Sequence, residues 1–353
     1  MTTRERVFAA LAHKQPDRCP VDLLLESTTC NTLMQYFHVN SQQELYDIFE
    51  ADMQFVFPDS TLPPVEILPD GTWFNRFGCH MRRVKNIFCE YVEQLSYPLA
   101  YVQEMDDFKA YDKWPDATAY DWAHFSEKIG SLHDKRIIKL HAGGLYEIAW
   151  QLRGQEQFLM DMALDPEIPH YIMNKLCDYW CDYIRYAMEA AGDKIDIVYT
   201  YDDIATQTSL IMSPDMLREF VYPYHEKVNS VIKSYGKTIL YHSCGAVFSQ
   251  IGALKSLPID ILNPLQPMAS GMDFSKIKEV WGDSLCFHGG VDVQSTLPHG
   301  TPEDVRNEVR RNIAVLGKNG GYILAPSHYI QNDTPIENIL AMYDVKLRGY
   351  EDS

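Results

Sequence analysis

Short β-rich runs alternate with helical patterns throughout the second half of the chain, and this alternation limits the fold more than any other feature. We expect strands at residues 194–199, 238–241, 259–262, 284–287 and 321–324. N-terminal capping signals and periodic apolar residues indicate helices between them, with a long helix opening at Ser213-Pro214 and others at 247–257, at 274–281, from Thr301-Pro302 and after Thr334-Pro335. Strands joined by helical crossovers run parallel, so the pattern predicts a parallel sheet covered by helices.

Side chains able to do chemistry follow each expected strand at the point where it ends. His141 follows the apolar run 137–140, and the later strands are followed by Asp202, Asp203, His242, Cys244, Asn263, His288, Asp292 and His328. Functional groups at the carboxyl ends of successive parallel strands are typical of the catalytic face of a (β/α)8 barrel. A doubly wound sheet would gather such groups mainly at one switch point, and no G-x-G-x-x-G phosphate loop is present. We therefore expect an α/β fold, a (β/α)8 TIM-type barrel.

The first 136 residues add features that precede or interrupt the barrel. Thr2 and Glu5 form a possible capping box for a first helix, and residues 19–23 resemble a strand. Residues 71–94 are typical of a β-hairpin inserted before the barrel resumes. No linker, repeat or low-complexity tract divides the chain, so we expect one barrel domain over residues 1–353, with an N-terminal extension and an inserted hairpin.

Composition excludes several classes of partner. The chain carries 31 Lys and Arg against 49 Asp and Glu, a net charge of −18, and no basic stripe that would follow a phosphate backbone. Nucleic acid is therefore not an expected partner. No run of eighteen uncharged apolar residues occurs, and the N-terminus has charges threaded through its apolar runs, so we expect a cytoplasmic protein with no membrane partner.

His242 and Cys244 are the strongest candidates for a metal site. In an extended segment residues i and i+2 point to the same side, so both side chains can face one point at the barrel mouth. Imidazole and thiolate are natural zinc ligands, and a catalytic zinc takes three protein ligands and keeps one position open. His328, after the strand at 321–324, is the best-placed third ligand. A buried cysteine beside a hydrogen-bonded histidine is the structural alternative.

The supporting residues also have structural alternatives. Asp203 and Gln207 are suited to capping the turn before the Ser213 helix, and Asp292 follows two glycines as an Asx-turn residue would. Glu147 can be the N-terminal carboxylate of a helix that it helps to open. His141 is suited to a hydrogen-bonded core position.

Several motifs together resemble the uroporphyrinogen decarboxylase superfamily. They are YHSCGAV, DILNPLQP, FHGGVDVQSTLPHGTPEDV, GGYILAPSHYIQNDTPIENI and, near the start, RERVFAALAHKQPDRCPVDL. Within the superfamily the chain is most similar to the branch of zinc-dependent corrinoid methyltransferases, such as the methylcobamide:coenzyme M methyltransferases. The resemblance covers most of the chain, is most specific from Asp202 onward, and implies a (β/α)8 barrel with a deep cleft at the strand carboxyl ends.

Two positions at which this sequence departs from the superfamily's motifs indicate which branch of the superfamily it resembles. The arginine-rich N-terminal segment of true uroporphyrinogen decarboxylases, which helps hold an octacarboxylate, is absent, and burying carboxylates without paired cations is costly. The resemblance to the methyltransferase branch implies His242 and Cys244 as zinc ligands. Its distant cysteine is replaced here by His328, and one thiolate fewer leaves the metal a stronger Lewis acid.

The resemblance therefore implies a zinc-dependent methyltransferase that works with a separate corrinoid-binding protein. The expected substrate is a small methylated molecule: a methoxylated aromatic, a methylamine or a thiol. Expected metal ligands are His242, Cys244 and His328, with Glu147 as a possible fourth. Expected catalytic or proton-handling residues are Asp202, Asp203 and Asp292, and expected substrate-binding residues are Glu147, Gln207, Asn263 and His288. Relatives suggest a possible homodimer.

Two other classes of function stay open. A metal-free decarboxylase or lyase would act on a smaller carboxylated substrate, with an aspartate in the cleft stabilising a protonated intermediate. A binding protein would hold a corrinoid or tetrapyrrole at the barrel mouth without catalysis. The chain has no corrinoid-binding D-x-H-x-x-G run, so a corrinoid is expected to belong to the partner protein.

Overall fold

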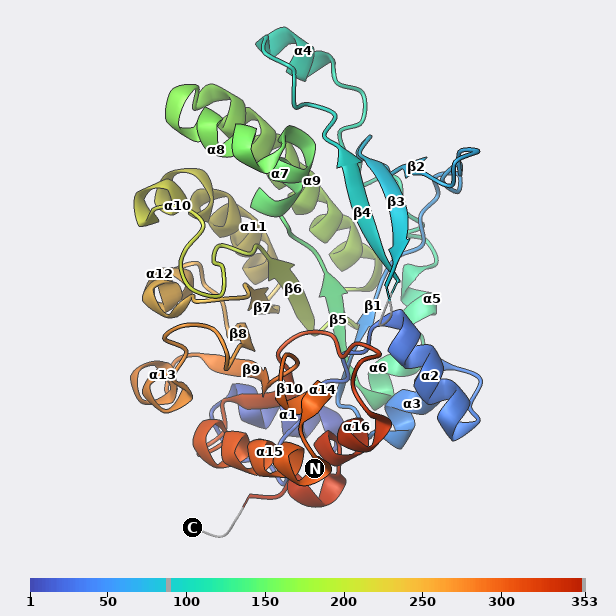
Figure 1. The fold of residues 1–353 in the computed structure, drawn as a ribbon, viewed down its shortest axis with the longest axis vertical. Helices are drawn as coiled ribbons and strands as arrows, with labels where there is room; N and C mark the ends of the chain where they lie inside the picture. The colour runs from blue at the N-terminus through green and yellow to red at the C-terminus, as the bar shows by residue number, and fades with distance from the viewer. Residues whose placement is uncertain (87–89, 351–353) are drawn as a thin grey trace.

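The computed structural model describes residues 1–86 and 90–350. Its centre is a curled sheet of parallel strands with helices around the outside (Figure 1). Sequential strands are neighbours in the order β1-β5-β6-β7-β8-β9-β10. Their bounds are β1 Met53–Val56, β5 Ile137–His141, β6 Ile197–Tyr201, β7 Thr238–His242, β8 Ile261–Leu265, β9 Cys286–Val291 and β10 Tyr322–Pro326.

Residues 21 and 22 close the sheet into a barrel. Val21 forms a parallel bridge with Leu324 of β10, and Asp22 forms one with Met53 of β1. The backbone N–H of Asp22 donates to the carbonyl of Leu324 at 3.0 Å. This segment thus takes the place of an eighth strand, although only as isolated bridges within the expected strand at 19–23. The predicted (β/α)8 barrel is confirmed.

Helices cover the outer face of the barrel (Figure 1). The longest is α9, Glu167–Ala191, which packs against α11, Tyr222–Ser234. The others are α1 Thr3–Leu11, α2 Ser27–Phe37, α3 Gln42–Ile48, α4 Met105–Ala110, α5 Phe125–Ile129, α6 Leu132–Lys135, α7 Tyr146–Arg153, α8 Gln155–Leu164, α10 Pro214–Phe220, α12 Ile251–Ser256, α13 Phe274–Trp281, α14 Thr296–His299, α15 Pro302–Leu316 and α16 Ile336–Met342, with 3₁₀ turns η1 Phe248–Gln250 and η2 Val345–Leu347.

The interior of the barrel changes from apolar to polar along the strands. At the amino ends, one inward residue per strand forms an apolar layer, which Val7 of α1 contacts; it comprises Met53, Ile137, Ile197, Leu240, Ile261, Cys286 and Ile323. Side chains two residues later point the same way, because strand side chains alternate between faces. Those positions hold Phe55, Lys139, Tyr199, His242, Asn263 and His288, which line a pocket. The alternation therefore places a polar layer above the apolar one.

Two local predictions are corrected. The long helix expected from Ser213-Pro214 is broken into α10 and α11 at Val221, where the backbone has φ −119° and ψ −58°. Pro223 has no N–H to donate to a carbonyl of the preceding turn, so one continuous helix is disfavoured. The helix expected at 247–257 begins instead as the 3₁₀ turn η1 and continues as α12. In contrast, the capping box of Thr2 and Glu5 is confirmed.

The inserted hairpin is also confirmed. Strands β3 (His80–Lys85) and β4 (Glu90–Ser96) pair antiparallel, and the short β2 (Trp73–Phe74) adds to β3. This second sheet projects from the barrel beside β1 and β5 (Figure 1). None of the helices in residues 1–86 and 90–350 has both the length and the apolarity needed to cross a lipid bilayer.

Candidate metal centre and pocket

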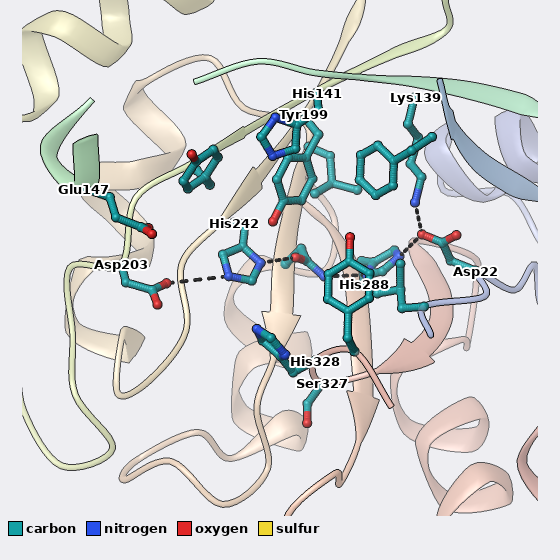
Figure 2. Close-up of a pocket in the computed structure, with 16 residues that line it drawn as sticks. Asp22, Lys139, His141, Glu147, Tyr199, Asp203, His242, His288, Ser327 and His328 are labelled. Atoms are coloured by element: carbon teal, nitrogen blue, oxygen red, sulfur yellow. Dashed lines mark hydrogen bonds and ion pairs between the residues drawn. The ribbon is translucent and has the colours of Figure 1, made fainter. Parts of the chain in front are cut away.

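A pocket of about 200 Å³ lies above the polar layer at the carboxyl ends of the strands. One wall is aromatic, and includes Phe55 of β1, Tyr199 and Tyr201 of β6 and Tyr329 after β10. His141 stacks on Tyr199 with ring centroids 5.2 Å apart, and burial lowers the pKa of His141 to about 4. The rest of the lining is polar, with His242 at its centre (Figure 2).

Three potential metal ligands converge beside His242. The ligand atoms of Asp203, His242 and Cys244 all lie within 4.8 Å of one another. His242 Nε2 is 3.4 Å from Cys244 Sγ and 3.6 Å from Asp203 Oδ1. Carboxylate, imidazole and thiolate are the three ligand types that proteins use for zinc. In chemistry and spacing, this group fits a three-ligand site for a divalent metal ion.

The loop after β7 holds Cys244 against Asp203. The backbone N–H of Cys244 donates to Asp203 Oδ1 at 2.7 Å, and that of Gly245 donates to Gln266 Oε1 at 2.8 Å. Gly245 has φ +91°, and a Cβ at this position would lie 2.4 Å from the carbonyl oxygen of Thr206. Only glycine fits such a conformation and approach without strain. The glycine therefore allows the tight turn that brings the thiol to the histidine.

The electrostatics of this side of the pocket favour a bound cation. Burial, and then the carboxylates of Asp203 and Glu147, raise the pKa of Cys244 well above its usual value. Burial, and then Asp202 and Asp203, raise the pKa of Glu147 to about 7. Burial lowers the pKa of His242, which keeps its imidazole neutral. A divalent cation would relieve the repulsion among these acidic groups and favour the thiolate, since metal binding is coupled to ligand deprotonation.

A buried chain of polar side chains extends away from His242 on the other side. His242 Nδ1 is 2.6 Å from Asn263 Oδ1, and Asn263 Nδ2 is 2.6 Å from His288 Nδ1. His288 Nε2 lies 3.0 Å from Asp22 Oδ2, which also forms an ion pair with Lys139 Nζ. Figure 2 shows the whole series from Lys139 to His242 and on to Asp203. Asp22, Lys139 and His288 are each about 1% exposed.

The structure brings together most of the residues predicted for the site. Glu147, Asp203, His242, Asn263, His288 and His328 line the pocket, and Cys244 contacts His242. His328 faces His242 across the pocket, with ring centroids 6.3 Å apart, but it lies outside the tight group of three potential ligands. Asp203, which the sequence suggested for proton handling, takes the position closest to the expected pair. Seven of the predicted residues therefore lie together, and Asp203 rather than His328 lies in the tight group with His242 and Cys244.

Asp202 lies outside the pocket lining. Its carboxylate accepts hydrogen bonds from the backbone N–H groups of Leu145, Tyr146 and Glu147 at 2.8–3.1 Å, at the start of α7. Its Oδ2 is also 2.6 Å from Nε2 of the buried His225. Asp202 is fully buried, so it is placed to fix the first turn of α7, and with it Glu147, rather than to touch a substrate. The expected role of Asp202 in proton handling stays a prediction, at a carboxylate that does not line the pocket.

Asp292 and Gln207 also lie outside the pocket lining. Asp292 accepts hydrogen bonds from the backbone N–H groups of Gln294 and Thr296, an Asx-type arrangement that opens α14. Gln207 is exposed, and its Oε1 accepts a hydrogen bond from Gln266 Nε2 at 3.1 Å. Gln266 in turn supports the Cys244 loop through Gly245. Asp292 and Gln207 are therefore placed to stabilise loops near the site rather than to line the pocket.

Asp22 and Lys139 are the main site residues that sequence reasoning missed. Lys139 interrupts the apolar run Ile137–Leu140 at an inward position, and a buried lysine requires a partner. The position of Lys139 in this run therefore indicates a charged group buried inside the barrel. Its partner, Asp22, is 117 residues away in sequence. No local pattern could have joined the two.

The fold and the site together define a class: an α/β-barrel protein with a cluster of potential metal ligands beside a pocket at the carboxyl ends of its strands. A family model described as "Uroporphyrinogen decarboxylase (URO-D)" matches residues 101–346. The chain belongs to this family of enzymes.

Relatives in the family carry two kinds of name. A uroporphyrinogen decarboxylase from Chlorobium phaeovibrioides is 26% identical over 185 residues, covering 50% of this chain and 48% of that protein. A methylated-thiol–coenzyme M methyltransferase from Methanosarcina mazei is 25% identical over 196 residues, covering 56% of this chain and 49% of that protein. The chain spans about half the length of the curated relatives it matches.

A solved structure is similar over the whole chain. A methyltransferase from Methanosarcina mazei superposes with a TM-score of 0.68 and 19% sequence identity, covering 99% of this chain and 98% of that one. At this identity the likeness establishes a shared fold. It agrees with the barrel described above, including the parts outside the family match.

Proposed function

We propose that this protein is a zinc-dependent methyltransferase, which moves a methyl group between a small methylated substrate and the cobalt of a corrinoid carried by a separate protein. The observation that carries the proposal is the convergence of Asp203, His242 and Cys244 at one side of the pocket. Similar proteins that are named as methyltransferases support this proposal. A possible homodimer and a cytoplasmic location remain expectations from the sequence.

His242, Cys244 and Asp203 would hold the metal, and His328 faces the same space as a candidate fourth ligand. When bound there, zinc would act as a Lewis acid toward a substrate heteroatom. Three protein ligands leave room for that atom, as in catalytic zinc sites generally. Cys244 is outside the pocket lining, whereas His242 and Asp203 border it. The open side of the cluster would therefore be the side that borders the pocket.

The shape of the pocket favours a methoxylated aromatic among the expected substrates. Phe55, Tyr199, Tyr201 and Tyr329 provide ring faces and edges suited to stacking. A volume of about 200 Å³ is enough for one substituted ring, since a 150 Å³ apolar cavity holds benzene. It is below the 300–1,000 Å³ typical of pockets for larger ligands, and so it argues against a tetrapyrrole.

The reaction has simple requirements for bonds and protons. Transfer would break the bond between the methyl carbon and the substrate oxygen, and the new bond from that carbon would use an electron pair of Co(I) in the corrinoid of the partner protein. The leaving oxygen gains a proton and becomes a phenol. Glu147 can hold that proton, because its carboxyl group lines the pocket and has a pKa near neutrality. The corrinoid protein must approach the pocket opening, so that cobalt meets the methyl group in line.

The charges of the pocket give less support to the decarboxylase alternative. The lining contains one lysine or arginine among the residues that the structure describes, Lys139, and its ammonium is already paired with Asp22. A substrate with several carboxylates would therefore find no free cation in this lining. Burying carboxylates without such partners is costly. This alternative predicts activity that survives removal of metal by a chelator.

Zinc content tests the core of the proposal. We expect about one zinc per chain in the purified wild type and little or none in Cys244→Ala, because the thiolate supplies one of three ligands. Cys30→Ala is the matched control, since Cys30 is a buried thiol in α2 outside the cluster. Metal analysis after gel filtration gives the numbers. Equal zinc in wild type and Cys244→Ala would refute the metal site.

The same proteins are then assayed for methyl transfer. Each is mixed with Co(I) cobalamin and a methoxylated aromatic, a methylamine or a methylated thiol, and methylcobalamin is followed by its absorbance. We expect the methoxylated aromatic to give the fastest reaction in wild type, a chelator to stop it and added zinc to restore it. Zinc binding without transfer from any of the three substrate classes would count against the methyltransferase and leave the metal site in place.

Asp203 and His328 are expected to differ in their importance for metal binding. Asp203→Ala should weaken zinc binding by more than about 100-fold, beyond the 10–100-fold typical of residues that only support ligands. His328→Ala should weaken it less, because His328 lies outside the tight cluster. Competition with a chromophoric chelator measures both affinities. A larger loss in His328→Ala would restore the ligand set expected from the sequence.

A further inference from the structure

The buried chain from Lys139 to His242 contains polar groups whose donors and acceptors must match. We propose that Lys139, Asp22, His288 and Asn263 act as positioning residues that lock His242 in the tautomer with its proton on Nδ1, so that the lone pair of Nε2 faces Asp203 and Cys244. This inference deepens the proposed function and rests on its metal site. It concerns residues two to five contacts away from the metal, none of which would touch it.

The donor-to-acceptor direction of the hydrogen bonds in this series is set at its charged end, where Asp22 and Lys139 lie. Asp22 is buried beside the ammonium group of Lys139, with which it forms an ion pair. Burial opposes ionisation of Asp22, but Lys139 and the hydrogen bond from His288 outweigh it and lower the pKa of Asp22 to about 2. An ionised carboxylate can only accept hydrogen bonds. His288 Nε2, 3.0 Å from Asp22 Oδ2, must therefore carry a proton and donate it.

The next contact depends on His288 being neutral. Burial, and to a smaller extent the charge of Lys139, lower the pKa of His288, although Asp22 opposes both. A neutral imidazole protonated on Nε2 has a lone pair on Nδ1. Nδ1 of His288 must then accept, and the only donor on the side chain of Asn263 is its amide NH₂ group. This places Asn263 Nδ2 at 2.6 Å from His288 and Oδ1 toward His242.

The final contact fixes the histidine of the cluster. Asn263 Oδ1 can only accept, so His242 Nδ1, 2.6 Å away, must be the N–H. A neutral His242 then has its lone pair on Nε2, the nitrogen that lies 3.4 Å from Cys244 Sγ and 3.6 Å from Asp203 Oδ1. If His288 carried two protons, the bond to Asp22 would keep its direction, but the two bonds through Asn263 would reverse and leave the proton of His242 on Nε2. Such a tautomer cannot bind a metal through that atom.

The register of the sheet explains how such distant residues meet. His242 is aligned with Asn263 in the β7–β8 pairing, and both point into the barrel. Asp22, bridged to Met53, faces the same interior from the closing segment. The four residues are at most 4% exposed, so water does not compete for these hydrogen bonds. The barrel therefore holds the orientation before any metal arrives, as hydrogen bonds to the outer nitrogen do in known metal sites.

Two substitutions at one position separate this role from simple packing. Asn263→Leu keeps the branched shape of the side chain but removes the acceptor, and should weaken zinc binding by about 10–100-fold. Asn263→Asp keeps an acceptor facing His242 Nδ1, and should bind zinc at least as tightly as wild type. Asn229→Leu is the control, because Asn229 is equally buried in α11 and donates to the carbonyl of Leu257 outside the chain of contacts. Zinc affinity is measured by chelator competition on folded protein.

The tautomer itself is observed without metal. In protein labelled with ¹⁵N-histidine and freed of metal, we expect His242 to show a protonated Nδ1 and an unprotonated Nε2, and Asn263→Leu to lose this preference. A protonated Nε2 in wild type would overturn the inference, as would equal zinc affinity in wild type and Asn263→Leu. Because this measurement uses metal-free protein, its failure differs from absence of zinc in the purified wild type, which would refute the proposed metal site.

Discussion

Lys139→Met is expected to lower the free energy of unfolding by about 3–5 kcal/mol, the range for breaking one side of a buried ion pair. The side chains of Lys139 and Asp22 are each 1% exposed, so the substitution leaves a carboxylate in the interior without its cation. The ammonium also lies 3.9 Å from the centroid of the Phe55 ring, and this contact is lost too. Urea unfolding of metal-free protein measures the change.

A surface pair of the same chemistry gives the matched control. Lys227 and Asp178 are 2.7 Å apart, with side chains 52% and 64% exposed. Lys227→Met should therefore change stability by less than about 1 kcal/mol, because water screens the pair. The double variant Lys139→Met with Asp22→Asn should recover part of the loss, since no unpaired charge remains. A cost for Lys139→Met no greater than that for Lys227→Met would show that the buried pair is not structurally important.

Glu147→Gln is expected to stabilise the metal-free protein at high pH and to have little effect at low pH. Burial, with Asp202 and Asp203, raises the folded-state pKa of Glu147 to about 7 from the ordinary 4.5. Below pH about 4.5 the group is protonated in both states and there is no penalty. As pH rises to about 7, the unfolded chain ionises Glu147 more readily than the folded one, and stability falls. The full penalty is about 3 kcal/mol, at about 1.4 kcal/mol per pKa unit.

Glutamine cannot ionise, so the difference in unfolding free energy between Glu147→Gln and the wild type measures the cost of ionising Glu147 in the folded protein. Unfolding free energies at pH 5, 6, 7 and 8 should show a gap that opens as pH rises and is complete by pH 8. Glu156→Gln, on an exposed turn of α8, serves as the control for loss of a carboxylate outside the site. With zinc bound beside Asp203, the gap should narrow, because the cation favours an ionised Glu147. A gap independent of pH would mean that Glu147 titrates normally.

The chemistry of the site divides between local and distant causes. His242 and Cys244 could be predicted as a pair because they lie two residues apart at the end of one strand, although Cys244 itself lies in the loop after β7. Asp202 and Asp292 could not be assigned in the same way, because both occur at strand ends as catalytic residues do. In the structure, their carboxylates instead accept hydrogen bonds from backbone N–H groups at the start of α7 and of α14. Those donors exist only once the helices are in place.

The choice between Asp203 and His328 shows the same division. The sequence places both after strands that border the pocket, and each has a chemically suitable ligand atom. Only the turn at Gly245, and the hydrogen bond from the Cys244 N–H to Asp203, bring the carboxylate to the cluster. His328 is instead held across the pocket by the loop after β10. Sequence spacing carries no information about such a difference of a few ångströms.

By itself, then, the sequence determined the α/β barrel, the face that carries the site and the His242–Cys244 pair, because strand alternation and helix capping are local properties of neighbouring residues. The tertiary structure alone decided which carboxylate joins that pair, and that Lys139 and Asp22 meet inside the barrel. Closure of the barrel pairs the segment of Asp22 with β1 on one side and with β10 on the other. The contact with β10 joins residues that are more than 300 positions apart in the sequence. The hydrogen-bonded chain to His242 exists only because that closure places its two ends in one polar layer.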